Sequence, residues 1–304
     1  MTFTDGLVDA QTAWFAEVDP MLPTAVRPPD GDVVTAALST GERVAGIVSV
    51  KSVAPDSLTS LWSALQLWEL HPLVGGGHGM AELLAQWQLI MSRRSPAPDS
   101  SCLVTWPSRD VAATKALLAH GLTPLSTLAI RTGPAAQATG GLSIRRARLT
   151  DIDVVVELAM AELDYSAHVG GAVLRPGARQ IKERALRQHI GQGDPVFVAE
   201  RDGIAVAFAE CWFNDSTVGS WSETRLPHGR WGYVNSVSVA PEARHAGVGR
   251  ELMSVVHGEL ARAGADRTFL YFNPPNPLSS VFWPRQGYRP LWTIWEARPA
   301  GALR

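Results

Sequence analysis

The chain has 304 residues, 46% of them hydrophobic and 18% charged, an ordinary composition for a globular protein with material for about two domains. The formal net charge of −2 and the lack of any lysine- or arginine-rich block argue against a dedicated nucleic-acid binder. Cys102 and Cys211 are the only cysteines, which argues against a disulfide scaffold and a cysteine zinc site. We find no signal-peptide pattern and no apolar run long enough to span a bilayer, so we expect a cytoplasmic protein without membrane contact.

The first half of the sequence alternates short apolar runs with turn residues, which predicts a mixed α/β organisation. The expected helices are 6–18, 80–91 and 110–120, and the expected strands are 32–38, 43–53, 65–70, 101–106 and 126–131. A glycine-rich run from Gly75 to Gly79 precedes the second of these helices. Residues 132–141 are small and polar, which predicts a flexible linker.

The second half repeats this order of elements in a fuller form. Its expected elements are strand 142–147, helices 150–163 and 178–190, strands 195–200, 204–212 and 233–239, a helix that carries Leu252 to Leu260, strand 268–272, a short helix and a last strand. The segment Gly121-Leu-Thr-Pro-Leu-Ser-Thr127 parallels Gly287-Tyr-Arg-Pro-Leu-Trp-Thr293, and each follows a short helix. The alternative is a coincidence between two glycine-proline turns, but the shared order of elements favours an internal repeat.

A valine-rich strand and an amphipathic helix flank the loop Arg244-x-x-Gly247-x-Gly249, which Arg250 follows directly. Glycines let backbone N–H groups approach a ligand closely, and a helix N-terminus adds partial positive charge. Arg244, His245 and Arg250 add further donors. This combination predicts a cradle for a pyrophosphate, although its spacing does not fit the dinucleotide fingerprint of a Rossmann fold.

The loop resembles the acetyl-CoA-binding motif of the GNAT superfamily of N-acetyltransferases. The segment from Asn276 to Tyr288 resembles the second signature of that family: an asparagine, a short helix with an aromatic pair, and a Gly-aromatic turn. The resemblance implies two tandem GNAT-like domains, each with a mixed, mostly antiparallel central sheet flanked by helices. Because Gly77-x-Gly79 lacks a counterpart of Arg244, we expect residues 1–131 to form a degenerate copy and residues 142–304 to form the acetyl-CoA-binding domain. This tandem layout is similar to that of mycothiol synthase.

The resemblance also implies acetyl-CoA as co-substrate, no metal, and acyl transfer to a primary amine by direct attack in a ternary complex. The acceptor would be a small-molecule or peptide amine, and the protein a monomer or a homodimer. The residues placed at the cofactor are Val237, Ser238, Val239, Arg244, His245, Ala246, Gly247, Val248, Gly249, Arg250, Asn276, Ser279 and Phe282. A backbone N–H near Val237 would stabilise the oxyanion, and Asn276 would hold the pantetheine arm.

Two positions depart from the family pattern. Asn235 stands where many members carry a glutamate base, and Trp283 stands where a tyrosine commonly protonates the thiolate. An amide cannot accept the proton, and an indole is too weak an acid to supply one. We therefore expect Glu210 to act as base, directly or through water, with Asn235 orienting a water molecule, and Tyr271 or Tyr233 to act as acid. The alternatives are an ion-paired Glu210 and tyrosines that only pack.

Loop histidines and tryptophans give a further hypothesis about the acceptor. His168 and His228 fall in loops that line the acceptor side in this family, and tryptophans around the predicted cleft would suit an aromatic acceptor pocket. These tryptophans are Trp212, Trp221, Trp231, Trp283, Trp292 and Trp295. The two departures also leave a non-catalytic acyl-CoA-binding regulatory module as an alternative. A mycothiol-synthase-like acetylation of a cysteinyl amine is another.

Overall fold

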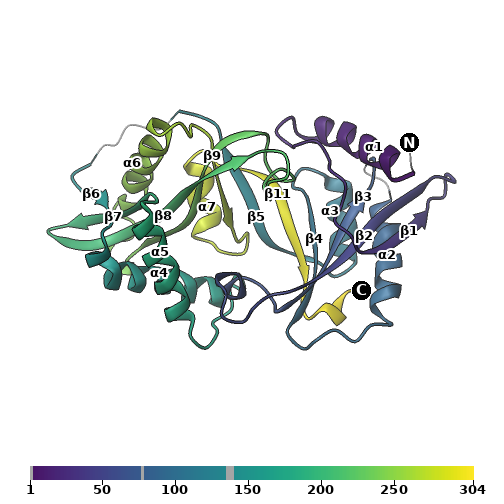
Figure 1. The fold of residues 1–304 in the computed structure, drawn as a ribbon, viewed down its shortest axis with the longest axis horizontal. Coiled ribbons are helices and arrows are strands. Elements are labelled where there is room, and N and C mark those ends of the chain that lie inside the picture. Colours follow the sequence, from purple (N-terminus) through teal and green to yellow (C-terminus); the bar gives the residue numbers. More distant parts are fainter. Residues whose placement is uncertain (1–2, 77–78, 135–139) are drawn as a thin grey trace.

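The computed structural model describes residues 3–76, 79–134 and 140–304, and all strands within them belong to one 11-stranded sheet (Figure 1). The strands are β1 (Asp32–Ala37), β2 (Arg43–Ser52), β3 (Gln66–Leu73), β4 (Ser100–Pro107), β5 (Thr123–Arg131), β6 (Ser143–Arg146), β7 (Val196–Arg201), β8 (Ile204–Ser216), β9 (Gly229–Val239), β10 (Thr268–Phe272) and β11 (Arg289–Ala297). Their order across the sheet is β1-β2-β3-β4-β11-β5-β10-β9-β8-β7-β6. Among the described residues the parallel pairs are β3–β4 and β9–β10, so the sheet is mixed and mostly antiparallel, as predicted.

Helices cover the sheet and connect its parallel strands. They are α1 (Phe3–Val18), α2 (Met80–Met91), α3 (Val111–Ala119), α4 (Ile152–His168), α5 (Ala178–Gln192), α6 (Val248–Arg262) and α7 (Ser279–Arg285). Parallel neighbours need a crossover, which α2 provides between β3 and β4 and α6 provides between β9 and β10. Each of these helices starts at a glycine in the left-handed region, Gly79 or Gly247. The two halves are therefore built to the same plan, as the repeat predicted.

The two halves exchange their last strands. β11, from the end of the chain, pairs with β4 of the first half, and β5 pairs with β10 of the second half. β5 and β11 also lie side by side (Figure 1). Thr127 is paired with Thr293 across this ladder. These threonines are equivalent positions in the two copies of the repeated segment, so the copies meet in the middle of the sheet. The predicted boundary after residue 131 falls between β5 and β6, but the sheet continues through both halves.

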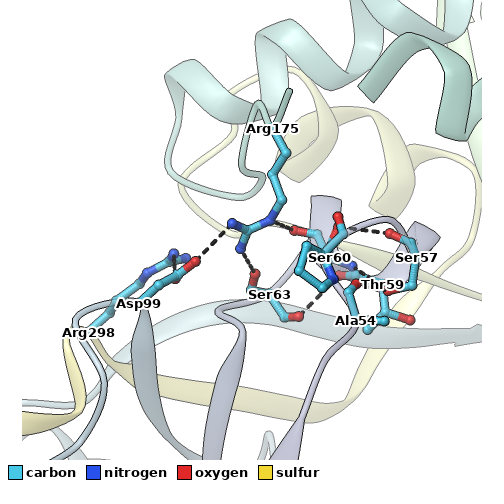
Figure 2. A network of polar contacts seen from close by, with 9 residues as sticks. Ala54, Ser57, Thr59, Ser60, Ser63, Asp99, Arg175 and Arg298 are labelled. Atoms are coloured by element: carbon cyan, nitrogen blue, oxygen red, sulfur yellow. Dashed lines mark hydrogen bonds and ion pairs between the residues drawn. The ribbon is translucent and has the colours of Figure 1, made fainter. Parts of the chain in front are cut away.

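Each half also sends a loop onto the other. The β2–β3 loop carries a short 3-10 helix, η1 (Leu58–Leu61), whose Leu61 is buried against Leu163 of α4. Figure 2 shows the guanidinium of Arg175, from the α4–α5 loop, donating to backbone carbonyls of this loop and to Asp99. Hydrophobic packing and charged hydrogen bonds thus hold this loop on the second half.

The β8–β9 loop makes the reverse contact. Its Leu226 is buried in the hydrophobic core of the first half, together with Phe269 of β10. The indole Nε1 of Trp292 donates to the carbonyl of Arg225 at 2.8 Å, and the guanidinium of Arg225 lies 3.7 Å from Glu69 of β3. The core of the first half therefore contains residues from both halves.

The predicted element types agree with the structure, and a few boundaries differ. α4 continues to His168, beyond its predicted end at residue 163, so His168 lies on a helix and not in a loop. β3 continues to Leu73, beyond its predicted end at residue 70. Gly77 and His78 of the predicted degenerate loop lie outside the described residues. Among the helices that are described, none is long and apolar enough to cross a membrane.

Candidate functional site

The strands β9 and β10 separate soon after they begin. Their parallel ladder joins residues 232–233 to residues 268–269, and beyond it, within the described chain, β9 pairs with β8 alone and β10 with β5 alone. The N–H of Ala240, just after β9, donates to the carbonyl of Val206 in β8. Because peptide groups point alternately to the two sides of a strand, those of Val237 and Val239 face the opening between β9 and β10. A strand edge that has no neighbouring strand in the described chain therefore lines this opening.

The glycine loop stands at the end of this edge. The backbone is left-handed at His245 (φ 65°) and again at Gly247 (φ 79°), which is the N-cap of α6. In the part of the chain that the structure describes, the backbone N–H groups of residues 245–250 have no protein acceptor, and the first hydrogen bond of the helix runs from Glu251 to Gly247. Unpaired amides at a helix N-terminus attract anions. Arg244 joins the loop to the strand, because its Nε donates to the carbonyl of Val239 at 3.1 Å.

A hollow of about 380 Å³ adjoins the glycine loop. Its lining residues are Gly140, Gly141, Leu142, Arg201, Ala246, Gly247, Arg250 and Glu251. The carboxylate of Glu251 accepts the N–H of Leu142 at 2.9 Å, which fixes the end of the predicted linker beside the loop. Two arginines and the unpaired amides make this hollow suitable for phosphate groups.

The second predicted signature also lies at the loop. The Oδ1 of Asn276 accepts the N–H groups of Leu278 at 2.9 Å and Ser279 at 3.2 Å, so this side chain caps α7. Its Nδ2 is the group that can donate to a ligand. Phe282 of α7 lies so close to α6 that a Cβ on Gly249 would meet its ring at 3.3 Å. The glycine therefore permits α6 and α7 to meet next to the anion site.

A buried carboxylate lies behind the β9 edge. A β-bulge interrupts the β8–β9 ladder between Glu210 and Cys211, opposite Asn235. The Nδ2 of Asn235 donates to Oε2 of Glu210 at 2.6 Å, and Nδ1 of His189, on α5, donates to Oε1 at 2.7 Å. Burial alone would raise the pKa of Glu210, but the hydrogen bond from His189 and nearby positive charge lower it. The hydrogen bond that His189 donates to Glu210 raises the pKa of His189, so the two form an ion pair.

A second carboxylate approaches the same part of β9 from α4. Oε2 of Glu162 accepts the hydroxyl of Ser236 at 3.2 Å, and Oε1 accepts the hydroxyl of Ser166 at the same distance. The Nζ of Lys182 lies 3.9 Å from Oε2 and 5.3 Å from the ring centre of Trp62, which belongs to the first half. Burial raises the pKa of Glu162, against the opposing effects of Lys182 and the two serines.

Tyrosines occupy the sheet between these carboxylates and the first half. The ring of Tyr233 stacks on Phe269 at 4.6 Å and lies 6.1 Å from the ring of Tyr271. Burial raises the pKa of both phenols, so both are protonated at neutral pH. Tyr271 is also close enough to Arg225 and Glu69 for their charges to shift its pKa. The site is therefore bordered by charged residues from both halves of the chain.

Most of the tryptophans in the predicted aromatic acceptor pocket are not accessible to a ligand. Four of the six tryptophans are buried in the hydrophobic cores: Trp231, Trp283, Trp292 and Trp295. Trp221 is 57% exposed, and Trp212 is the one that lies beside the described site, with its ring 4.7 Å from that of His189. His168 and His228 have exposed side chains, and neither contacts the carboxylates described above.

Sequence reasoning missed three residues of the site, His189, Glu162 and Lys182. Lys182 and His189 are seven positions apart on α5, with the buried Leu186 between them on the same face. Glu162 follows the buried Ala159 at helical spacing on α4. A charged residue on the core-facing side of a helix was the available signal, since such positions are seldom charged unless the group is paired.

The comparisons with known proteins agree with this geometry. Residues 160–288 match the model of the acetyltransferase (GNAT) family. The structure of a GCN5-related N-acetyltransferase from Sphaerobacter thermophilus is 16% identical and aligns over 98% of this chain and 93% of that chain, with a TM-score of 0.58. A GNAT-family acetyltransferase from Colwellia psychrerythraea is 12% identical and aligns over 97% of both chains, with a TM-score of 0.52. At these identities the likeness shows the fold, and it extends over both halves. No curated protein matches the sequence.

Proposed function

We propose that this chain, whose residues 160–288 match the model of the acetyltransferase (GNAT) family, moves an acetyl group from acetyl-CoA to a primary amine by direct attack in a ternary complex. The observation that carries the proposal is the opening between β9 and β10, whose strand edge ends at the unpaired amides of residues 245–250. A long thioester with a pyrophosphate near one end suits a strand edge that ends in an anion site.

In this proposal the loop binds the pyrophosphate and the strand edge binds the pantetheine arm. The phosphate-binding residues are Arg244, His245, Ala246, Gly247, Val248, Gly249 and Arg250. The peptide groups of Val237 and the N–H of Val239 pair with the arm, while Ser238 between them keeps β9 bonded to β8. Asn276 donates its Nδ2 to the arm, and Ser279 and Phe282 line it.

The reaction needs a neutral amine, a donor for the tetrahedral oxyanion and a proton for the leaving sulfur. We assign the donor to the N–H of Val237, because it faces the opening. We assign the proton for the sulfur to Tyr271 of β10, where β10 has separated from β9. Both carboxylate oxygens of Glu210 already accept hydrogen bonds, so this residue acts by holding Asn235 and His189 in place.

A thiol-release assay with acetyl-CoA and a panel of amines, a cysteinyl amine among them, tests this function. Arg244→Ala should weaken CoA binding at least about tenfold, which corresponds to about 1.4 kcal/mol. Arg262→Ala is the matched control, because Arg262 is an exposed residue at the other end of α6 and should leave CoA affinity unchanged. Equal CoA affinity in the two variants would refute the assignment of the loop.

The same assay separates the enzyme from the non-catalytic alternative. The absence of a glutamate at Asn235 and the burial of Trp283 are the observations that favour a regulatory acyl-CoA-binding module. Tight CoA binding without turnover on any amine in the panel would establish that module. Turnover with any one of the amines would exclude it and would name the class of acceptor.

A further inference from the structure

We propose that Glu162 of α4 is the general base that takes a proton from the acceptor amine, replacing the glutamate that GNAT proteins commonly carry at the position of Asn235. This inference rests on the proposed function. It assigns the proton transfer to a residue on a helix, outside both of the family's sequence signatures.

The position of Glu162 supports this role. Its Oε2 accepts the hydroxyl of Ser236, and Ser236 lies between Asn235 of the bulge and Val237, whose N–H faces the opening. A carboxylate from α4 therefore reaches the segment of β9 at which a strand-borne base would act. Asn235 itself contributes only an amide, which is turned toward Glu210.

The two neighbouring carboxylates differ in their freedom to accept a proton. Glu210 has a side chain that is 2% exposed, and an imidazole and an amide hold its two oxygens. Glu162 is 23% exposed, and its hydrogen-bond partners are the hydroxyls of Ser166 and Ser236. A hydroxyl can rotate from donating to accepting when the carboxylate gains a proton, whereas an amide N–H cannot. The surroundings of Glu162 thus tolerate both of its protonation states.

The charges around Glu162 favour a base that works near neutral pH. Lys182 faces it from α5, Glu210 from β8 and Tyr233 from β9. Burial raises the pKa of Glu162, and the charge of Glu210 acts in the same direction, whereas Lys182 opposes them. A base whose pKa lies closer to the working pH transfers protons more effectively. Glu210, held as an ion pair with a lowered pKa, is the poorer base.

The step balances without any further reactant. The acceptor arrives as an ammonium ion and gives one proton to the carboxylate of Glu162. The neutral nitrogen then forms the C–N bond to the acetyl carbon, and the C–S bond of the thioester breaks. The departing sulfur gains a proton, the nitrogen loses its second one, and Glu162 returns its proton to solvent. The net products are the amide, free thiol and one proton.

Kinetics of Glu162→Gln against pH test the inference. With an alkylamine acceptor, kcat/KM at neutral pH should fall about 100-fold or more, and the acidic limb of the pH profile should disappear. With a fluorinated analogue of the same acceptor, whose amine is already neutral, the loss should be much smaller. Glu157→Gln is the matched control, because Glu157 is on the same helix with an exposed side chain paired to Arg179. It should keep the wild-type profile.

Further measurements keep the outcome clear. CoA affinity should be unchanged in Glu162→Gln, and Glu162→Asp should retain the acidic limb with a lower kcat. An acidic limb that persists in Glu162→Gln would overturn the inference and leave the proposed function standing. Equal losses with the alkylamine and its fluorinated analogue would also overturn it. A wild-type protein that turns over no amine would refute the proposed function and this inference together.

Discussion

The contact between Arg175 and the β2–β3 loop makes a quantitative prediction about how the halves are joined. The Nε of Arg175 donates to the carbonyl of Ser60 at 2.6 Å, and its Nη2 donates to the carbonyl of Ser63 at 2.9 Å (Figure 2). Its Nη1 donates to Asp99 at 2.8 Å, and the side chain is 12% exposed. Arg175→Met preserves most of the side-chain volume and removes all three hydrogen bonds.

The expected loss of stability follows from these contacts. Removing one partner of a buried ion pair costs about 3–5 kcal/mol, because the remaining charge stays unpaired. Asp99 is 32% exposed and keeps Arg298 at 2.6 Å, so it is not left alone. The two carbonyls lose a charged donor, which is worth about 1.5–3 kcal/mol for each hydrogen bond before water replaces part of it. We therefore expect Arg175→Met to reduce the free energy of unfolding by about 3 kcal/mol.

Urea denaturation followed by circular dichroism measures this change. Arg179→Met is the matched control, because Arg179 is an exposed residue near the start of α5 whose ion pair with Glu157 should be worth less than about 1 kcal/mol. A loss for Arg175→Met that is equal to that of the control would refute the reasoning. It would mean that water satisfies the β2–β3 loop as well as the guanidinium does.

The pH dependence of the same variant gives an independent check. Burial tends to raise the pKa of Asp99, but the hydrogen bond and charge of Arg175 and the charge of Arg298 lower it below the ordinary aspartate value. A lowered folded-state pKa stabilises the protein above the unfolded-state pKa, and the contribution disappears as the pH falls through the folded-state value. The difference between wild type and Arg175→Met should therefore shrink on acidification. A constant difference would show that the Asp99 contact adds nothing.

Three further predictions concern the site and the exchange of strands. In Glu210→Gln, the NMR titration midpoint of His189 should fall, because the partner that raises its pKa is gone. Wild type should lose stability as the pH rises through the folded-state pKa of His189, and the variant should not show this loss. An unchanged midpoint would exclude the ion pair. Gly247→Ala should cost about 1–2 kcal/mol of stability in denaturation assays and should weaken CoA binding. Gly264→Ala is the control, because Gly264 has a similar φ at the other end of α6, and it should reduce stability without changing CoA affinity. Equal CoA affinities in the two variants would count against the loop as the CoA site. Residues 142–304 expressed alone lack β5, so one edge of β10 is left unpaired. We expect this fragment to aggregate, or to fold only when the first half is added, as judged by size-exclusion chromatography. A well-folded monomer would contradict this prediction.

The glycine loop could be predicted from the sequence because all of its signals lie in one short stretch. The β-branched strand before it, the glycines within it and the amphipathic helix after it each report local geometry. The left-handed backbone at Gly247 and the unpaired amides that follow are direct consequences of that pattern. The mixed sheet and its helices were likewise predictable, since apolar periodicity depends on neighbouring positions.

The exchange of strands could not be predicted, because the two copies of the repeat look alike. β5 and β11 carry related sequences and similar apolar patterns, so either would fit beside β4 or β10. Their pairing is decided by contacts between distant parts of the chain. The same applies to Glu162 and His189, whose partners lie on strands far along the sequence. A sequence pattern placed these residues on helices but gave no sign of what they face.

The exchanged strand gives a physical reason why the first half matters to a site whose anion-binding loop belongs to the second. Two neighbouring strands with unpaired edges would normally close, because unpaired peptide groups are costly once they leave water. Here β10 pairs with β5 along its whole length, and Nδ2 of Asn273, just beyond β10, donates to the carbonyl of Leu125 at 2.8 Å. On the other side, β8 holds β9, and the bulge at Asn235 bends that strand. Each strand is thus fixed by its outer neighbour, so the opening persists between them. β5 therefore shapes the site by holding β10 in place.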